Sequence, residues 1–316
     1  MRGHIDTGLE GPPRDTGLKG QPRPEWVDRP ERGNTLALRF VVWVALTLGR
    51  PAARLLLLPI CLYFLIFSSG SYAASTSYLR KVLPRKPGLA DAFRHYHAFA
   101  ATLLDRVFLF NDQYARFDVH VNGEDILPDM TARGEGCILL GAHMGSFEII
   151  RALGRRNKSA RISLVMYEEN ARKIKSVIDA INPNLSLQII SLGKLDSMLK
   201  VEAALNQGEI VGMLGDRTFQ GEDTVACRFL GEPARFPSGP FRLAAMLKRP
   251  IVMMFGLYRG GNRYDVYFER IVDSWPAQRA ARDNLLERSL HRYVERLEHY
   301  CRDAPYNWYN FYDFWQ

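Results

Sequence analysis

The sequence contains few cysteines, and none of them are paired at metal-binding spacing. The four cysteines are far apart and form no Cys-x-x-Cys motif: Cys61, Cys137, Cys227 and Cys301. This spacing predicts neither a zinc site nor a disulfide framework, so we expect a protein that has no metal site and works in a reducing compartment. An early apolar region is also missing, since the first one begins around Leu36, and we therefore expect no cleavable signal peptide.

The motifs of serine hydrolases and of nucleic-acid-binding proteins are absent from the sequence as well. The sequence has no Gly-x-Ser-x-Gly nucleophile elbow, although Ser146 follows His143 by three residues. No nucleic-acid-binding motif is found, and the basic residues are mixed with acidic ones along the chain, so we expect no nucleic-acid partner. A membrane-associated esterase or thioesterase stays open as an alternative, as does a non-catalytic protein that binds a membrane surface.

The composition is that of a folded, basic protein. With 316 residues, of which 47% are hydrophobic, the chain can bury a large core, and we expect one domain with appendages that works as a monomer. The formal net charge is +8 and the pI is about 9.3. This charge favours an anionic partner, which could be a membrane surface, a phosphorylated substrate or nucleic acid, and charge alone does not choose among them.

The first 70 residues divide into two parts of different composition. Residues 1–34 are rich in Gly, Pro, Arg and acidic residues, which predicts a disordered tail. Residues 36–67 hold two apolar runs that flank residues 49–54. Neither run alone reaches the roughly 20 residues that a membrane-spanning helix needs.

We expect residues 35–70 to be a helical segment that attaches the protein to the membrane interface. Arginine is costly at bilayer depth, so Arg39, Arg50 and Arg54 would extend toward anionic head groups. A tilted, kinked span and a buried hairpin of a soluble protein are the alternatives.

Residues 71–316 alternate between predicted strands and helices, which is typical of an α/β domain with a mixed, largely parallel sheet flanked by helices. The strands are expected at 117–122, 138–140, 161–166, 187–191, 209–214, 224–231, 250–255 and 264–271. The helices are expected at 71–83, 89–110, 170–181, 194–205, 241–248 and 276–301, with a loop at 235–240. In such sheets, ligands bind beyond the carboxyl ends of the strands.

The segment from Gly136 to Ile150 carries the best candidate catalytic residues. A short apolar strand is followed by a turn with His143 and Gly145 and then by a predicted helix with Glu148. A carboxylate that binds one imidazole nitrogen leaves the other free to accept a proton. We therefore expect Glu148 to orient His143 as a general base, with a structural hydrogen bond at a helix start as the alternative.

Two further segments add candidates. Asp216 and Arg217 follow the predicted strand at 209–214, where a carboxylate and a guanidinium can hold a phosphate or an oxyanion; a surface turn with a local ion pair is the alternative. The tail at 305–315 is strongly aromatic, and its possible roles are packing over the core, a belt at the membrane interface, or part of an acyl pocket.

Taken together, these motifs resemble the lysophospholipid acyltransferase superfamily and, within it, the bacterial late acyltransferases of lipid A biosynthesis. The His-x-x-x-x-Asp/Glu box matches His143 to Glu148, the acidic and arginine element matches Asp216 and Arg217, and the Tyr-Asn-Trp-Tyr-Asn tail begins at Tyr306. The similarity runs from about Trp26 to the end of the chain.

The resemblance implies an enzyme on the cytoplasmic face of a bacterial inner membrane. It would move a fatty acyl group from an acyl-carrier-protein or coenzyme A thioester to a hydroxyl of a lipid A-like glycolipid or another envelope lipid, without a metal or another cofactor. His143 and Glu148 would be catalytic, and Asp216, Arg217 and Gly145 would contact substrate. Arg161 and Arg172 are the candidates for a further arginine that this branch uses.

Overall fold

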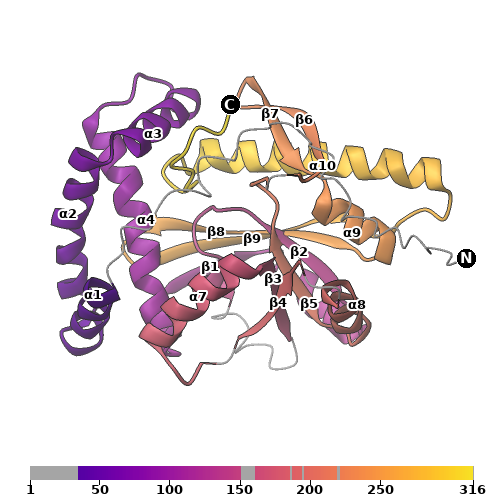
Figure 1. Ribbon diagram of the computed structural model, residues 1–316, viewed down its shortest axis with the longest axis horizontal. Helices are drawn as coiled ribbons and strands as arrows, with labels where there is room; N and C mark the ends of the chain where they lie inside the picture. Colours follow the sequence, from indigo (N-terminus) through magenta and orange to yellow (C-terminus); the bar gives the residue numbers. More distant parts are fainter. Residues whose placement is uncertain (1–34, 151–160, 186, 194–195, 219–220, 316) are drawn as a thin grey trace, which may run out of the picture.

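A computed structural model describes residues 35–150, 161–185, 187–193, 196–218 and 221–315 of the chain. Within them, α-helices and β-strands alternate after an N-terminal run of helices (Figure 1). The predicted disordered tail, residues 1–34, lies outside the described residues.

A sheet of seven strands forms the centre of the molecule, in the order β1-β9-β8-β2-β5-β3-β4. Five neighbouring strands are parallel, whereas β9 is antiparallel to β8 and β1 is parallel to β9, so the predicted mixed, largely parallel sheet is confirmed. The strands are β1 (Asp118–Asn122), β2 (Cys137–Gly141), β3 (Ile162–Tyr167), β4 (Gln188–Leu192), β5 (Ile210–Leu214), β8 (Ile251–Gly260) and β9 (Arg263–Val272).

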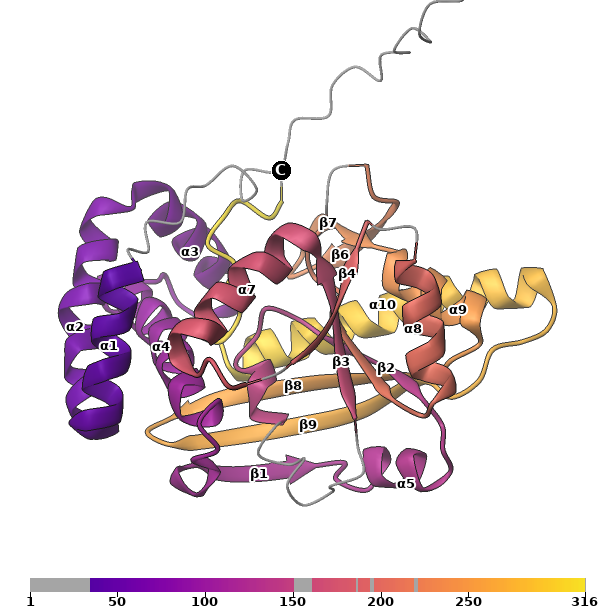
Figure 2. The same cartoon turned by 60° about the horizontal axis from the view of Figure 1, so that its bottom comes forward.

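Helices cover both faces of this sheet (Figure 2). One face packs against α3 (Ser69–Val82), α8 (Ser197–Asn206), α9 (Gly239–Leu247), α10 (Arg279–Asp303) and the hairpin of β6 (Thr224–Phe229) and β7 (Glu232–Pro237). The other packs against α1 (Thr35–Thr47), α2 (Gly49–Phe67), α4 (Leu89–Leu109), α5 (Ile126–Ala132) and α7 (Glu168–Ile181).

Strand β2 shows why the sheet needs both layers. All five of its residues are buried. Ile138 and Leu140 point into one hydrophobic core and Cys137 and Leu139 into the other, as the twofold period of a strand requires. A continuous apolar run is therefore a correct sign of a strand covered on both faces.

Two sequence predictions need correction. Arg235 to Pro240, predicted as a loop, includes part of β7, because it pairs with β6 although prolines occur in it. The arginines of α2, expected to extend toward anionic head groups, have partners within the protein. Arg50 is paired with buried Asp105 at 2.7 Å, and Arg54 donates to the Gly261 carbonyl and the Tyr258 hydroxyl.

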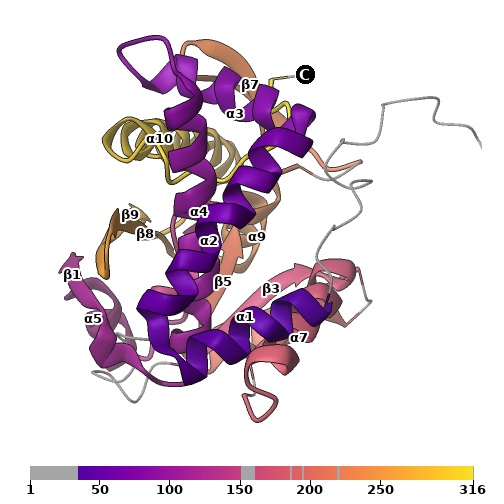
Figure 3. The ribbon, with the colours of Figure 1, turned by 90° about the vertical axis from the view of Figure 1, so that its left-hand side faces the viewer.

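The α1–α2 layer lies on one side of the molecule, with α2 beside α4 (Figure 3). By length and composition, α2 is apolar enough to cross a membrane. It packs inward through Ala53, Leu57 and Cys61, so the alternative of a buried hairpin describes only one face of this layer. Large apolar side chains on the other face are exposed, among them Leu55, Leu62 and Ile66.

Candidate active site

The turn after β2 carries His143 at the carboxyl edge of the parallel strands. Gly145 closes this turn with a φ of +60°, and a Cβ there would meet the Gly256 carbonyl oxygen at 1.9 Å, so only glycine fits. Its amide donates to the Asn307 carbonyl at 2.8 Å, and the Tyr309 amide donates to the His143 carbonyl at 2.7 Å. Gly145, predicted to contact substrate, thus has a clear role in shaping the backbone.

Asp216 is the carboxylate that binds His143. The imidazole Nδ1 lies 2.8 Å from Asp216 Oδ1, and the His143 main-chain amide donates to Oδ2 at 3.0 Å. An ionised carboxylate only accepts hydrogen bonds, so Nδ1 carries the proton and Nε2 presents its lone pair. This is the tautomer that a general base requires.

Strand pairing explains how these two residues meet. β2 and β5 are parallel neighbours in register, with Gly141 opposite Leu214. His143 and Asp216 each stand two residues beyond this pair, so they leave the sheet at the same place. The structure therefore corrects the expected His143–Glu148 hydrogen bond, since the partner comes from the next strand of the sheet.

Burial and hydrogen bonds define the state of Asp216, whose side chain has no exposed surface. Trp308 Nε1 donates to its Oδ2 at 2.9 Å, so three N–H groups hold the carboxylate. Burial by itself raises the pKa of Asp216, but the charges and hydrogen bonds of His143, the Arg217 cation and the Trp308 donor lower it below its usual value. The carboxylate is ionised.

The pKa of His143 is also lowered. Desolvation is the main cause, and the Arg217 and Arg106 cations act in the same direction, while Asp216 opposes them. The ring is therefore neutral near pH 7. Its side chain is 31% exposed, which leaves an approach for another molecule.

Glu148 lies in the 3-10 helix η2 (Phe147–Ile149), close to the same turn but bound to other groups. Its Oε1 pairs with Arg106 at 2.8 Å, and the Ser146 hydroxyl donates to its Oε2 at 3.2 Å. Ser146 is thus bonded to Glu148, and it pairs with no histidine of the described residues in the way a serine hydrolase requires. Glu148 and its Arg106 pair form a second charged group beside His143.

Arg217 follows Asp216 and binds the C-terminal tail. Its guanidinium donates to Asn310 Oδ1 at 3.2 Å and to the Tyr309 carbonyl at 3.0 Å, and it lies over the Tyr312 ring. The surface-turn interpretation of this segment is therefore wrong.

The two other candidate arginines lie apart from each other. Arg161 precedes β3, and its carbonyl accepts from the Ile210 amide at the start of β5, which is the edge opposite to His143. Arg172 is exposed in α7, which begins directly after the carboxyl end of β3. The structure does not bring Arg161 to His143. Arg172 belongs to a helix that begins at the carboxyl edge of the sheet, which is the edge that carries His143.

Trp308 is the contributor that sequence reasoning did not single out. Its side chain is fully buried, and besides donating to Asp216 its carbonyl is bound to His95 Nε2 at 2.8 Å. Ser75 binds the other ring nitrogen of His95 at 2.8 Å, so both nitrogens of this buried ring are bonded within the protein. The aromatic tail was the available signal, and the packing interpretation describes Trp308 correctly.

In the described part of the chain, no group of three or more His, Cys, Asp and Glu residues is placed to hold a metal ion. The four cysteines are buried and unpaired.

A carboxylate-bound histidine at the carboxyl edge of an α/β sheet, with a His-x-x-x-x-Glu box and an apolar helix layer beside it, is the arrangement expected of a membrane-associated acyltransferase. The branch follows from comparison with known families: residues 26–316 match the model of the bacterial lipid A biosynthesis acyltransferases, and the chain belongs to this family. A comparison with curated proteins gives no match.

Membership makes the protein an acyltransferase that acts in lipid A biosynthesis, with a lipid acceptor and an acyl donor. The family is generally membrane-associated, which agrees with the length and apolar composition of α2.

Proposed function

We propose that the protein transfers a fatty acyl group from an acyl-carrier-protein or coenzyme A thioester to a hydroxyl of a lipid A-like glycolipid, with His143 as general base. The observation that carries this proposal is the pairing of the His143 Nδ1 with buried Asp216 at 2.8 Å. This pairing directs the basic Nε2 away from the carboxylate.

The reaction needs one base and no covalent enzyme intermediate. Nε2 of His143 takes the proton of the acceptor hydroxyl while its oxygen attacks the thioester carbonyl carbon, giving a tetrahedral intermediate. The C–S bond then breaks, the ester remains on the acceptor, and the departing thiolate takes the proton from the imidazolium. Asp216 stabilises that imidazolium, and the Arg217 cation favours the oxyanion.

Glu148 has a supporting role in this scheme. Its pairing with Arg106 at 2.8 Å keeps a cation beside the imidazole. The positive charge favours the neutral, basic form of His143.

The exposed apolar side of the α1–α2 layer supports a location of this chemistry at a lipid surface. We propose that a monomer attaches to the cytoplasmic face of the inner membrane through the exposed apolar side of α1 and α2. No further cofactor is required, because the thioester is already activated.

Membranes containing the protein provide a direct test. They are incubated with a labelled acyl thioester, on acyl carrier protein or on coenzyme A, and with a glycolipid acceptor. His143→Ala is expected to abolish transfer, whereas His120→Ala, an exposed residue of β1, keeps it. Full activity of His143→Ala would overturn the mechanism, and release of free fatty acid without acceptor would indicate a hydrolase.

Membrane attachment has its own test. Replacing Leu55, Leu62 and Ile66 together by serine removes exposed apolar surface from α2 without touching its buried face. The protein is expected to move from the membrane to the soluble fraction. Leu199→Ser on α8, an equally exposed leucine, is the control, and unchanged partition of the triple variant would contradict attachment through α2.

A further inference from the structure

A cavity of about 900 Å³ lies between α2, α4, the β8–β9 turn and the C-terminal segment. His143 and Asp216 do not line it. Residues 305–307 are part of its wall, and the Asn307 carbonyl binds the Gly145 amide, so this segment lies between the cavity and the His143 turn. The cavity is therefore a place separate from the proposed catalytic pair.

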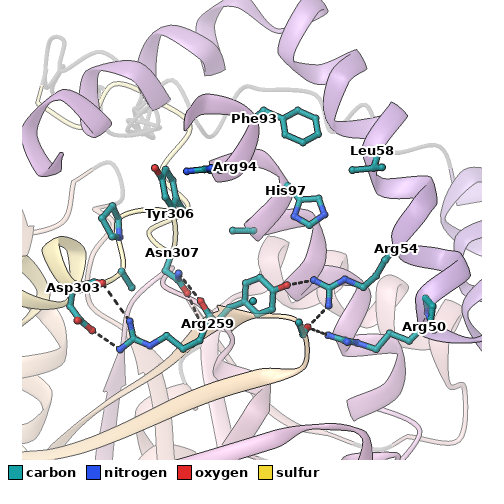
Figure 4. Close-up of a pocket in the computed structure, with 17 residues that line it drawn as sticks. Arg50, Arg54, Leu58, Phe93, Arg94, His97, Arg259, Asp303, Tyr306 and Asn307 are labelled. Carbon is teal, nitrogen blue, oxygen red and sulfur yellow. Dashed lines mark hydrogen bonds and ion pairs between the residues drawn. The ribbon is translucent and has the colours of Figure 1, made fainter. Parts of the chain in front are cut away.

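Cations dominate the wall of this cavity. It contains four arginines and a single carboxylate: Arg50, Arg54, Arg94, Arg259 and Asp303. Figure 4 shows Arg54 extending from α2 and Arg259 extending to Asp303. The wall therefore has a positive potential.

The carboxylates satisfy only part of this charge. Arg50 pairs with Asp105, and Arg259 pairs with Asp265 and Asp303. Arg54 donates instead to the neutral Tyr258 hydroxyl and Gly261 carbonyl, and within the described residues neither Arg54 nor Arg94 forms an ion pair.

Apolar side chains continue from the cavity along α2. Arg54, Leu58, Leu62 and Ile66 follow at a spacing of four residues, so neighbours in this series are adjacent on the helix surface. Leu58 lines the cavity, and the last three are 44%, 50% and 62% exposed. They extend over roughly 12 Å of helix. A cationic cavity thus opens onto an exposed apolar stripe.

We propose that this cavity binds the phosphate group of a membrane lipid, whose acyl chains lie along Leu58, Leu62 and Ile66. Arginine forks match pairs of phosphate oxygens and stay charged, and basic pockets beside membrane helices bind lipid head groups. An amphiphile supplies both the anion that Arg54 and Arg94 attract and the apolar cover that α2 offers. This site does not depend on the proposed acyl transfer.

Binding of a short-chain lipid to the full chain in detergent tests the proposal. The probe is dihexanoyl phosphatidic acid, measured by calorimetry, with inorganic phosphate as a second probe. Arg94→Gln is expected to weaken lipid binding about tenfold, because charged hydrogen bonds are lost. Arg94→Lys keeps the positive charge but lacks the paired N–H donors of a guanidinium, so a smaller loss of lipid affinity is expected.

Arg279→Gln provides the matched control, since it removes the same charge from α10, where the side chain is 89% exposed. It is expected to bind the lipid like the unchanged protein. Equal lipid binding by the unchanged protein and a folded Arg94→Gln variant would overturn the site. Inorganic phosphate binding as tightly as the lipid would overturn the part played by α2. No binding of either probe would overturn the proposal altogether.

Discussion

The C-terminal segment 305–310 separates two charged regions, the His143–Asp216 pair on one side and the arginine-lined cavity on the other. The two regions differ in how completely their charges are paired. Asp216 is buried and held by three N–H groups. Arg54 and Arg94 line an open cavity and form no ion pair with a carboxylate of the described residues. A buried, fully bonded charge fixes one geometry, as a catalytic base requires, whereas surplus cations suit a ligand that brings its own anion.

Asp216→Asn gives the largest expected effect on this comparison. An amide can donate to Nδ1 and favour the wrong imidazole tautomer, so kcat is expected to fall on the order of 10³-fold or more. Acyl transfer in membranes measures this, and binding of dihexanoyl phosphatidic acid is expected to stay unchanged. Asp273→Asn, an exposed residue after β9, is the control. A folded Asp216→Asn variant with full activity would show that the pair is structural.

Trp308→Phe has a smaller expected effect, because it removes one donor to Asp216 and keeps the aromatic packing against Phe229. We expect kcat to fall about tenfold. Steady-state transfer kinetics measure this fall. Trp275→Phe is a close match, since that indole donates to the Arg249 carbonyl instead. If both variants retain full kcat, the Trp308 hydrogen bond has no positioning role.

The pH dependence gives the smallest effect. A general base must be neutral, so kcat/KM rises with pH through the pKa of His143, which lies below its ordinary value. Arg217→Gln removes a cation that lowers this pKa, so the acid limb moves to higher pH. Arg228→Gln, an exposed arginine of β6, leaves it in place. If the acid limb of the kcat/KM profile of Arg217→Gln does not shift, or shifts to lower pH, the electrostatic role of Arg217 is contradicted.

Local patterns predicted the fold well and the contacts poorly. Buried strands such as β2 are visible as apolar runs, because burial on both faces acts on every residue of the strand. The partner of His143 stands 73 residues away, and it is adjacent only because β5 pairs with β2. Glu148 was the nearest carboxylate in sequence, but Arg106 from α4 binds it.

The arginines of α2 illustrate the same limit. Composition alone suggested membrane contacts for Arg50, since its neighbours are apolar. Asp105 lies 55 residues later, and only the packing of α2 on α4 brings it to Arg50. A sequence gives the residues available for pairing, but the tertiary fold selects the pairs.

The distance along the chain between the His143 turn and the segment that fixes it has a consequence for biosynthesis. The Trp308 donor follows Asp216 by 92 residues, and Asn307 and Tyr309 beside it bind the turn directly. Because N-terminal parts emerge first during translation, α1 and α2 are available to a membrane well before the turn is fixed. We expect the nascent chain to reach its lipid surface while still inert, and to become competent for reaction only there.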